Sequence, residues 1–155
     1  MAVITNTMLL VRRISDLQRR RDILVERQDR LRRSLPEWTF MPLQLVGMSA
    51  DEIRSMMTDL TKAEQDAGLD EIERELENLD RQIEELENML LTTPSRSLDS
   101  VMAVLDLAIT RFRSQTVSDP DDVFYDYGDA RVLFFLERAA DDLRSMLSMD
   151  HRNAS

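Results

Sequence analysis

Cysteine is absent from this chain of 155 residues, and glycine, proline, histidine and lysine are scarce. Without cysteine, the chain can form no disulfide, no thiolate metal site and no cysteine nucleophile. Three glycines and four prolines provide little turn chemistry for a many-stranded protein, so a few long helices are expected. The single histidine, His151, lies in a polar C-terminal stretch and cannot build a zinc site by itself. We therefore predict no metal and no cofactor.

Long apolar runs are also missing. No segment approaches the roughly 20 apolar residues that a membrane-spanning helix needs. The N-terminal apolar stretch comes before its arginines, whereas a secretory signal places positive charge before the apolar run. Apolar residues nevertheless make up 43% of the chain, which is enough to bury a core. We expect a soluble, cytoplasmic protein that does not bind membranes.

Signatures of catalysis are missing as well. The chain has no glycine-rich phosphate loop, no nucleophile elbow and no histidine placed to act as a general base. An aspartate cluster at 119–129 fails the spacing of a calcium-binding EF-hand, because Val123 and Ala130 stand where acids are required. Helix capping explains these acids, and weak divalent binding stays open. We predict that the protein is not an enzyme and has no catalytic residues.

Heptad periodicity is the main feature that the chain does contain. Leucines recur every seven residues from Leu10 to Leu31, which predicts a helix over 8–35. Arg21 and Gln28 occupy positions of the same seam that are usually apolar. Polar residues there lower stability but can fix the register or the number of partners. The spacing therefore predicts a coiled-coil-like helix that packs against others.

An apolar segment with the only tryptophan follows this helix. Pro36 ends the helix, because the residue before a proline is pushed out of the helical region. The segment 36–48 is too short and too interrupted by proline to be helical, so we expect a loop. It either folds back over the end of the bundle or docks a partner, as exposed aromatic clusters often do. The candidate partner-binding residues in it are Trp38, Phe40, Met41 and Leu43.

A second long helix is expected over 50–91. Ser49 followed by Glu52 is the signature of a capping box. Apolar residues from Leu69 to Leu90 then alternate in steps of three and four without a miss, and this register changes near Gly68. Either the helix bends there or two helices meet. We favour one helix with a defect at Gly68, because a one-residue loop cannot reverse a chain.

The remaining chain is expected to form a C-terminal helix pair over 98–149. The first helix of the pair spans about 98–115. Asp119 would cap a helix that restarts at Pro120, with an interruption at Gly128. Residues 150–155 are expected to be a disordered tail.

Charge is divided unevenly along the chain. Residues 1–36 carry nine basic and four acidic side chains, a net charge of +5, while the remainder carries a net −15. A basic and an acidic helix in one chain attract each other, so the arginines already have an intramolecular partner. The arginines at g positions are Arg13, Arg20 and Arg27, and the acids at e positions of the later helix are Glu73, Asp80 and Glu87.

Pairing between g and e positions belongs to parallel helices, whereas a simple hairpin is antiparallel. Either the pairs form between chains, or the bundle has more than two helices. We retain Arg13, Arg20 and Arg27 as candidate partner-binding residues. Nucleic acid is not the expected partner, because leucines share the arginine-rich segment and the rest of the chain would repel phosphate.

The C-terminal stretch TTPSRSLDSVMAVLDLAITRFR, followed by LFFLERAADDLRSML, resembles a pattern in short, uncharacterised helical proteins of alphaproteobacteria. The matching residues are Thr93, Pro94, Leu98, Val101, Leu105 and the run from Leu136 to Leu143. The pattern departs where that family has glycine and lysine, with Ser100 and Ala103 nearby instead. The resemblance covers about the last 65 residues. It implies a helix–loop–helix C-terminal part and a bacterial cytoplasmic setting, and no activity.

Together these observations predict an all-α fold with a long coiled-coil-like arm or hairpin over 8–91, followed by the helix pair. We expect a homo-oligomer that acts as a non-enzymatic interaction or assembly protein with an unknown protein partner. Two alternatives stay open. One is a regulator that contacts nucleic acid through the arginine-rich first helix. The other is a small acidic chaperone for a partner protein.

Overall fold

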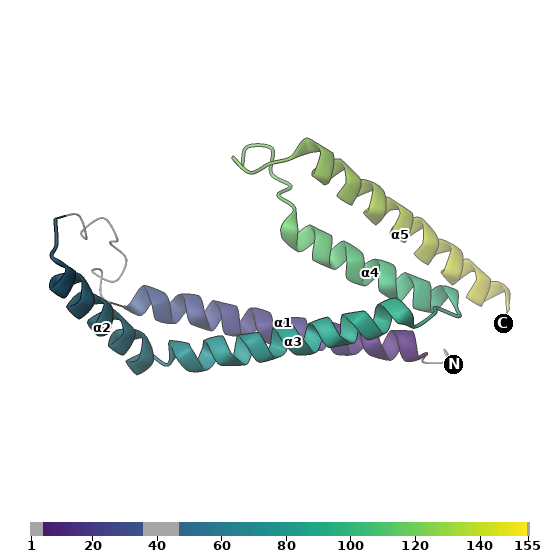
Figure 1. Ribbon diagram of the computed structural model, residues 1–155. Coiled ribbons are helices and arrows are strands. Elements are labelled where there is room, and N and C mark those ends of the chain that lie inside the picture. Colours follow the sequence, from purple (N-terminus) through teal and green to yellow (C-terminus); the bar gives the residue numbers. More distant parts are fainter. Residues whose placement is uncertain (1–4, 36–46, 155) are drawn as a thin grey trace. The chain divides into compact units, whose positions relative to one another are not determined.

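The computed structural model describes residues 5–35 and 47–154 of the chain. Within these residues the protein is all-α, with five helices and no strand, which confirms the predicted fold class. The helices are α1 (Asn6–Ser34), α2 (Ala50–Asp66), α3 (Leu69–Thr92), α4 (Leu98–Gln115) and α5 (Tyr127–Asn153) (Figure 1). No described helix combines the length and the apolar character needed to cross a bilayer.

The chain divides into two compact units. The hairpin unit spans Asp16–Glu85, and the C-terminal unit combines the residues up to Ser15 with those from Leu86 onward. The boundary therefore runs through α1 and α3 and not through the 92–97 loop, where the sequence suggested it. Hydrogen bonding explains part of this division, because the Thr5 and Ser100 hydroxyls lie 2.6 Å apart.

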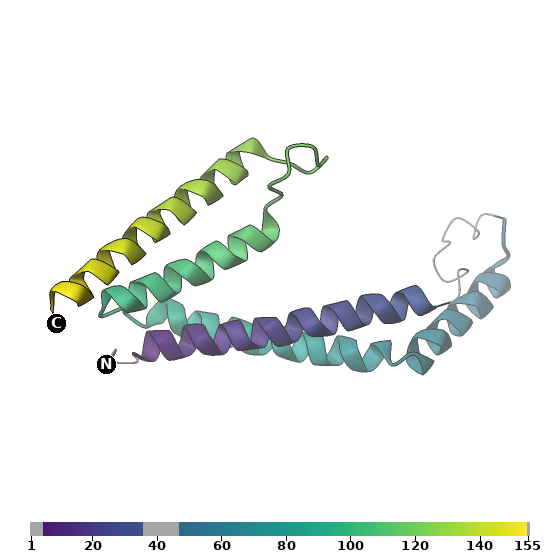
Figure 2. The same cartoon turned by 180° about the vertical axis from the view of Figure 1, so that it is seen from behind.

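Within the hairpin unit, α1 and α3 run side by side in opposite directions (Figures 1 and 2). Their direction follows from the cross-helix ion pairs, since a later residue of α1 meets an earlier residue of α3. Arg20 pairs with Glu75 at 2.6 Å and Arg32 pairs with Glu73 at 3.2 Å. The buried side chains are apolar residues at the predicted heptad positions. They are Leu17, Leu24, Leu69, Ile72, Leu79 and Ile83.

Between α2 and α3 the backbone breaks at the glycine that the sequence singled out. The predicted capping box opens α2, with the Ser49 N–H donating to Glu52 Oε2 at 2.8 Å. Gly68 has φ +77°, a left-handed conformation that ends a helix and that side chains other than glycine rarely adopt. Its N–H donates to the Gln65 carbonyl at 3.0 Å. The chain therefore forms two helices here, where we had favoured a single one.

In the C-terminal unit, α4 and α5 form an antiparallel pair (Figures 1 and 2). The first of these helices is capped by Ser97, whose hydroxyl accepts the Ser100 N–H at 3.1 Å. The core cluster between the helices is apolar and consists of Met102, Ile109, Leu133 and Ala140. Partly buried apolar residues pack against it, namely Leu105, Phe112, Leu136, Leu143 and Leu147.

The start of α5 corrects two expectations. Asp126 is its N-cap and accepts the Asp129 N–H at 2.9 Å, and the helix continues through Gly128 without a break. Asp119, the expected cap, instead accepts the Asp121 N–H at 3.0 Å. Short aspartate side chains often hydrogen-bond to a backbone N–H two residues on, and this arrangement stabilises a turn and not a helix.

The end of α5 corrects a third expectation, because the helix extends to Asn153 and residues 150–153 are not disordered. Its last turn carries Arg152, and a cationic side chain is favourable at a helix C-terminus. The Ala154 N–H closes the turn by donating to the Asp150 carbonyl at 3.1 Å.

Candidate protein-interaction surface

The apolar loop that the sequence proposed for partner binding lies outside the described residues. Trp38, Phe40, Met41 and Leu43 all fall within the segment 36–46. The prediction made for them therefore stays a prediction.

The three candidate arginines of α1 have different surroundings. Arg20 forms the ion pair with Glu75 inside its own unit. Arg13 and Arg27 are exposed and form no ion pair with any described residue. The structure therefore does not bring the three side chains together on one common acidic partner.

The three acids expected to pair with these arginines all form ion pairs, but each of them with a different arginine from those expected. The pairs are Arg32–Glu73 at 3.2 Å, Arg21–Asp80 at 2.5 Å and Arg111–Glu87. The hydrogen bond that Arg21 Nε donates to the Asp80 carboxylate raises the pKa of the Arg21 guanidinium above its ordinary value, against the opposing effect of desolvation. Both polar seam residues of α1 thus face acids, since Gln28 also lies 3.5 Å from Glu73. Antiparallel helices within one chain account for these contacts.

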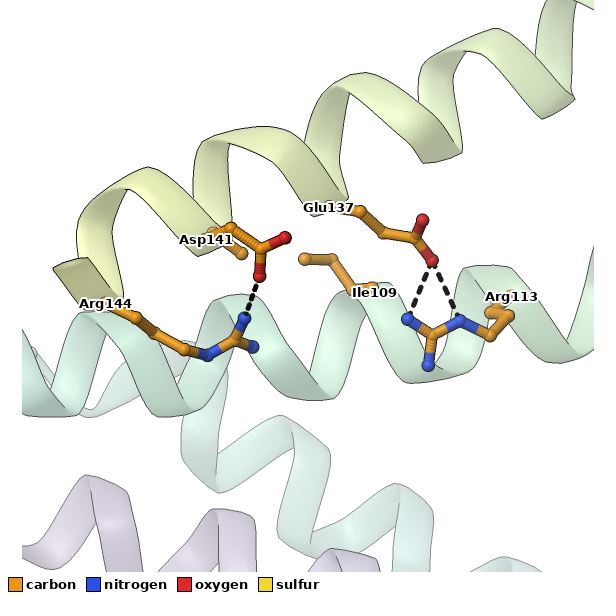
Figure 3. Close-up of a pocket in the computed structure, with 6 residues that line it drawn as sticks. Ile109, Arg113, Glu137, Asp141 and Arg144 are labelled. Atoms are coloured by element: carbon orange, nitrogen blue, oxygen red, sulfur yellow. Dashed lines mark hydrogen bonds and ion pairs between the residues drawn. The ribbon is translucent and has the colours of Figure 1, made fainter.

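A polar pocket of about 250 Å³ lies between α4 and α5. Figure 3 shows Arg113 facing Glu137 across it, with a hydrogen bond of 2.7 Å, and Arg144 donating to Asp141 at 2.7 Å. Arg144 also pairs with Asp106. Because each arginine is matched by a carboxylate, the groups of this pocket neutralise one another and leave little charge for a ligand.

An apolar groove of about 170 Å³ lies nearer the end of the same helix pair. It is lined by Leu98, Val101, Met102, Leu143, Met146, Leu147 and Asp150. Leu98 and Met146 are each 62% exposed, so their apolar surface faces solvent. The groove shows that α4 and α5 do not bury all of their apolar side chains against each other.

A second set of exposed apolar side chains lies in the turn before α5 and in the first turns of that helix, and we call it the aromatic surface. Its members are Val123, Phe124, Tyr127, Val132, Phe134 and Phe135. Phe124 is 81% exposed, and Tyr127 and Phe135 are 65% and 66% exposed. Arg131 connects the last two, since its guanidinium carbon lies 5.5 Å from the Tyr127 ring centre and 5.7 Å from that of Phe135. These distances are typical of cation–π contacts.

Aspartates are the sequence neighbours of Val123, Phe124 and Tyr127 in the aromatic surface, and we call these aspartates the acidic rim. Between Ser114 and Ala130 the chain has no arginine or lysine. The five acids in this stretch are Asp119, Asp121, Asp122, Asp126 and Asp129. None of them forms an ion pair with a described residue, although three accept backbone N–H groups. The rim therefore keeps an uncompensated negative charge beside exposed aromatic rings.

The sequence did not predict the aromatic surface, although it contains a signal for part of it. The seam of α5 that packs on α4 comprises Leu133, Leu136, Ala140, Leu143 and Leu147. A second apolar seam exists one residue out of step with the first, in steps of three and four. It comprises Val132, Phe135, Ala139, Met146 and Met149, with Asp142 as its one polar position. A helix with two apolar seams has more apolar surface than one neighbouring helix can cover. This second periodicity is the sequence signal that some apolar side chains of α5 stay exposed.

No group of side chains suited to holding a metal ion occurs among the described residues. Comparison with protein-family models, with curated proteins and with solved structures gives no match to this chain.

Proposed function

We propose that this chain is a non-enzymatic interaction or assembly protein that binds another protein through the aromatic surface of α5. The observation that carries the proposal is the exposure of Phe124, Tyr127 and Phe135 together. Contiguous exposed apolar patches on soluble proteins commonly mark interaction sites. Residues that dominate binding energy in such sites are enriched in aromatic residues and arginine, which is the composition of this surface.

The rigidity of α5 supports the same proposal. Its opposite face is anchored by Leu133 and Ala140, which are 2% and 1% exposed. Tyr127, Phe134 and Phe135 therefore project from a helix whose other face is packed, and the Arg131 guanidinium contacts two of the rings. A partner that docks here loses little binding energy to the ordering of flexible groups.

A regulator that contacts nucleic acid is the second candidate, favoured by the exposed arginines of α1 that have no ion pair among the described residues. These are Arg12, Arg13, Arg27, Arg30 and Arg33. Acids are interleaved with them at Asp16, Asp22, Glu26 and Asp29, which weakens the field that phosphate would experience. Binding to phosphate would fall steeply with salt concentration, and that dependence separates the two candidates. A chaperone would instead hold a single client protein, and it would use the same aromatic surface.

The test is affinity capture of the tagged full-length chain from its native cells, with and without nuclease, read by mass spectrometry. We expect one protein at near-stoichiometric amount, unchanged by nuclease. The double variant Tyr127→Ser, Phe135→Ser should lose it. Truncating central aromatic residues of an interface typically costs 2 kcal/mol or more each, or about thirtyfold in affinity.

The matched control is Leu91→Ser, which removes an apolar side chain that is 83% exposed on α3. This variant should retain the partner, because Leu91 lies outside the aromatic surface. It loses an exposed apolar side chain of similar kind, so it controls for a general loss of surface hydrophobicity. Retention of the partner by the aromatic double variant would refute the proposal. Recovery dependent on intact nucleic acid would instead support the regulator.

A further inference from the structure

We infer that the partner of the aromatic surface is a second copy of this chain, which presents the exposed arginine side of its α1. This inference rests on the proposed function and names its partner. Two features carry it. One is the acidic rim, whose five aspartates have no ion pair among the described residues. The other is a set of exposed arginines around an exposed isoleucine in the same chain.

The arginine side of α1 is complementary to the rim in both charge and apolar character. Ile23 is 63% exposed, on a helix whose other face is buried. Arg27 lies one helical turn further along and Arg30 two turns further, on the same side. Both are exposed and form no ion pair with a described residue. We call Ile23, Arg27 and Arg30 the arginine patch.

Apolar contact and charge both have to contribute to this interface. Surface ion pairs alone are weak, and Glu26 lies beside the arginine patch and reduces its net charge. Val123 and Phe124, exposed by 89% and 81%, provide the apolar surface that Ile23 would cover. Charge then selects the orientation and opposes a pairing of two like patches.

The two patches are different surfaces of one chain, so the contact is heterologous. Each copy offers one aromatic surface and one arginine patch, and association continues until a ring closes or a filament grows. The smallest such ring is a two-fold dimer in which each copy places its arginine patch on the aromatic surface of the other, whereas pairing of like with like would use the same patch on both copies. The two modes predict different behaviour when variants are mixed.

The experiment is sedimentation equilibrium of the full chain over a concentration series, with two variants. Phe124→Ser with Asp122→Arg removes the aromatic acceptor, and Ile23→Ser with Arg27→Glu removes the arginine donor. All four positions are exposed, and circular dichroism checks that both variants keep their helices. We expect wild-type protein to associate into a closed ring, of two copies or more, or into a filament, and each variant alone to be a monomer.

Mixing the two variants in equal amounts is the decisive step. Each mixture still contains one intact acceptor and one intact donor, so a one-to-one dimer should form and grow no further. Raising the ionic strength from about 0.05 to about 0.5 M should weaken this dimer about tenfold, because the charges are solvent-exposed. Ser145→Ala, an exposed polar position outside both patches, should associate like the wild type.

A monomeric wild type at every concentration would overturn the inference, and so would self-association that survives in either variant. Capture of a different protein that depends on Tyr127 and Phe135 would then leave the proposed function standing. If the wild-type protein neither self-associated nor captured a partner, both the inference and the proposed function would be wrong.

Discussion

Polar side chains occupy two seam positions of α1 in the α1–α3 pair, whereas the core cluster between α4 and α5 is apolar throughout. Arg21 and Gln28 face acids of α3, so a shift of the helices past each other would separate them from those acids. Polar seam residues specify register at a cost in stability, while apolar burial provides stability with less specificity. The two pairs thus show two ways of joining antiparallel helices in one chain.

The largest effect should come from removing a buried leucine from each pair. Leu133→Ala and Leu79→Ala should each lower the free energy of unfolding by about 3 kcal/mol, since each side chain is only 2% exposed. Guanidinium unfolding followed by circular dichroism measures the loss. Leu91→Ala, at an exposed position, should change stability by less than about 0.5 kcal/mol.

Amide hydrogen exchange then tests whether the two units open separately. Leu133→Ala should accelerate exchange mainly in α4 and α5, and Leu79→Ala mainly in the hairpin unit. If amide exchange accelerated uniformly along the whole chain in both variants, the two units would unfold as one cooperative unit and would not open separately.

The next effect concerns helix caps with the same chemistry in different surroundings. Ser97→Ala should lower stability by about 1 to 2 kcal/mol, because the Ser97 hydroxyl caps α4 and also lies 2.8 Å from the Ser100 hydroxyl. Ser49→Ala removes a similar cap from α2, a helix that buries no residue. Its effect should be confined to exchange of α2 amides. Equal losses of global stability from both caps would contradict this difference.

A smaller effect is expected at the break between α2 and α3. Gly68→Ala should cost about 1 kcal/mol, because φ +77° is strained for alanine although nothing lies within 4 Å of the added Cβ. Thermal unfolding of the variant measures the cost. Gly128→Ala is the control, since that glycine is inside a helix and only the Asp126 carboxylate must move slightly. A stabilised Gly68→Ala protein would mean that α2 and α3 can merge.

The smallest effect should come from the polar seam itself. Arg21→Leu should raise the free energy of unfolding by about 0.5 kcal/mol, because it adds apolar seam surface while Asp80 stays hydrated at 51% side-chain exposure. Chemical unfolding of the variant measures this gain. The raised pKa of Arg21 means that its stabilising contribution is complete below the ordinary arginine pKa and is lost only as pH rises through the raised value. The effect of the substitution should therefore be the same at pH 6 and pH 8, and a clear loss of stability would contradict it.

Local patterns in the chain predicted the elements well where one physical signal dominated. Heptad spacing located the buried face of α1 at Leu17 and Leu24, and the capping box located the start of α2. Prediction was less accurate where two signals competed. Several aspartates in the segment 119–129 have the side chain that a helix N-cap requires. Asp126 is the cap because α5 begins at Tyr127.

Composition and periodicity were enough to determine an all-α chain with its apolar seams, because helix formation and amphipathic burial depend on residues close in sequence. Which arginine meets which acid, and which apolar side chains remain exposed, was decided only by tertiary structure. The second seam of α5 shows the reason. Both of its seams are largely apolar in sequence, but the single neighbour α4 can cover only one of them, so Val132 and Phe135 remain at the surface.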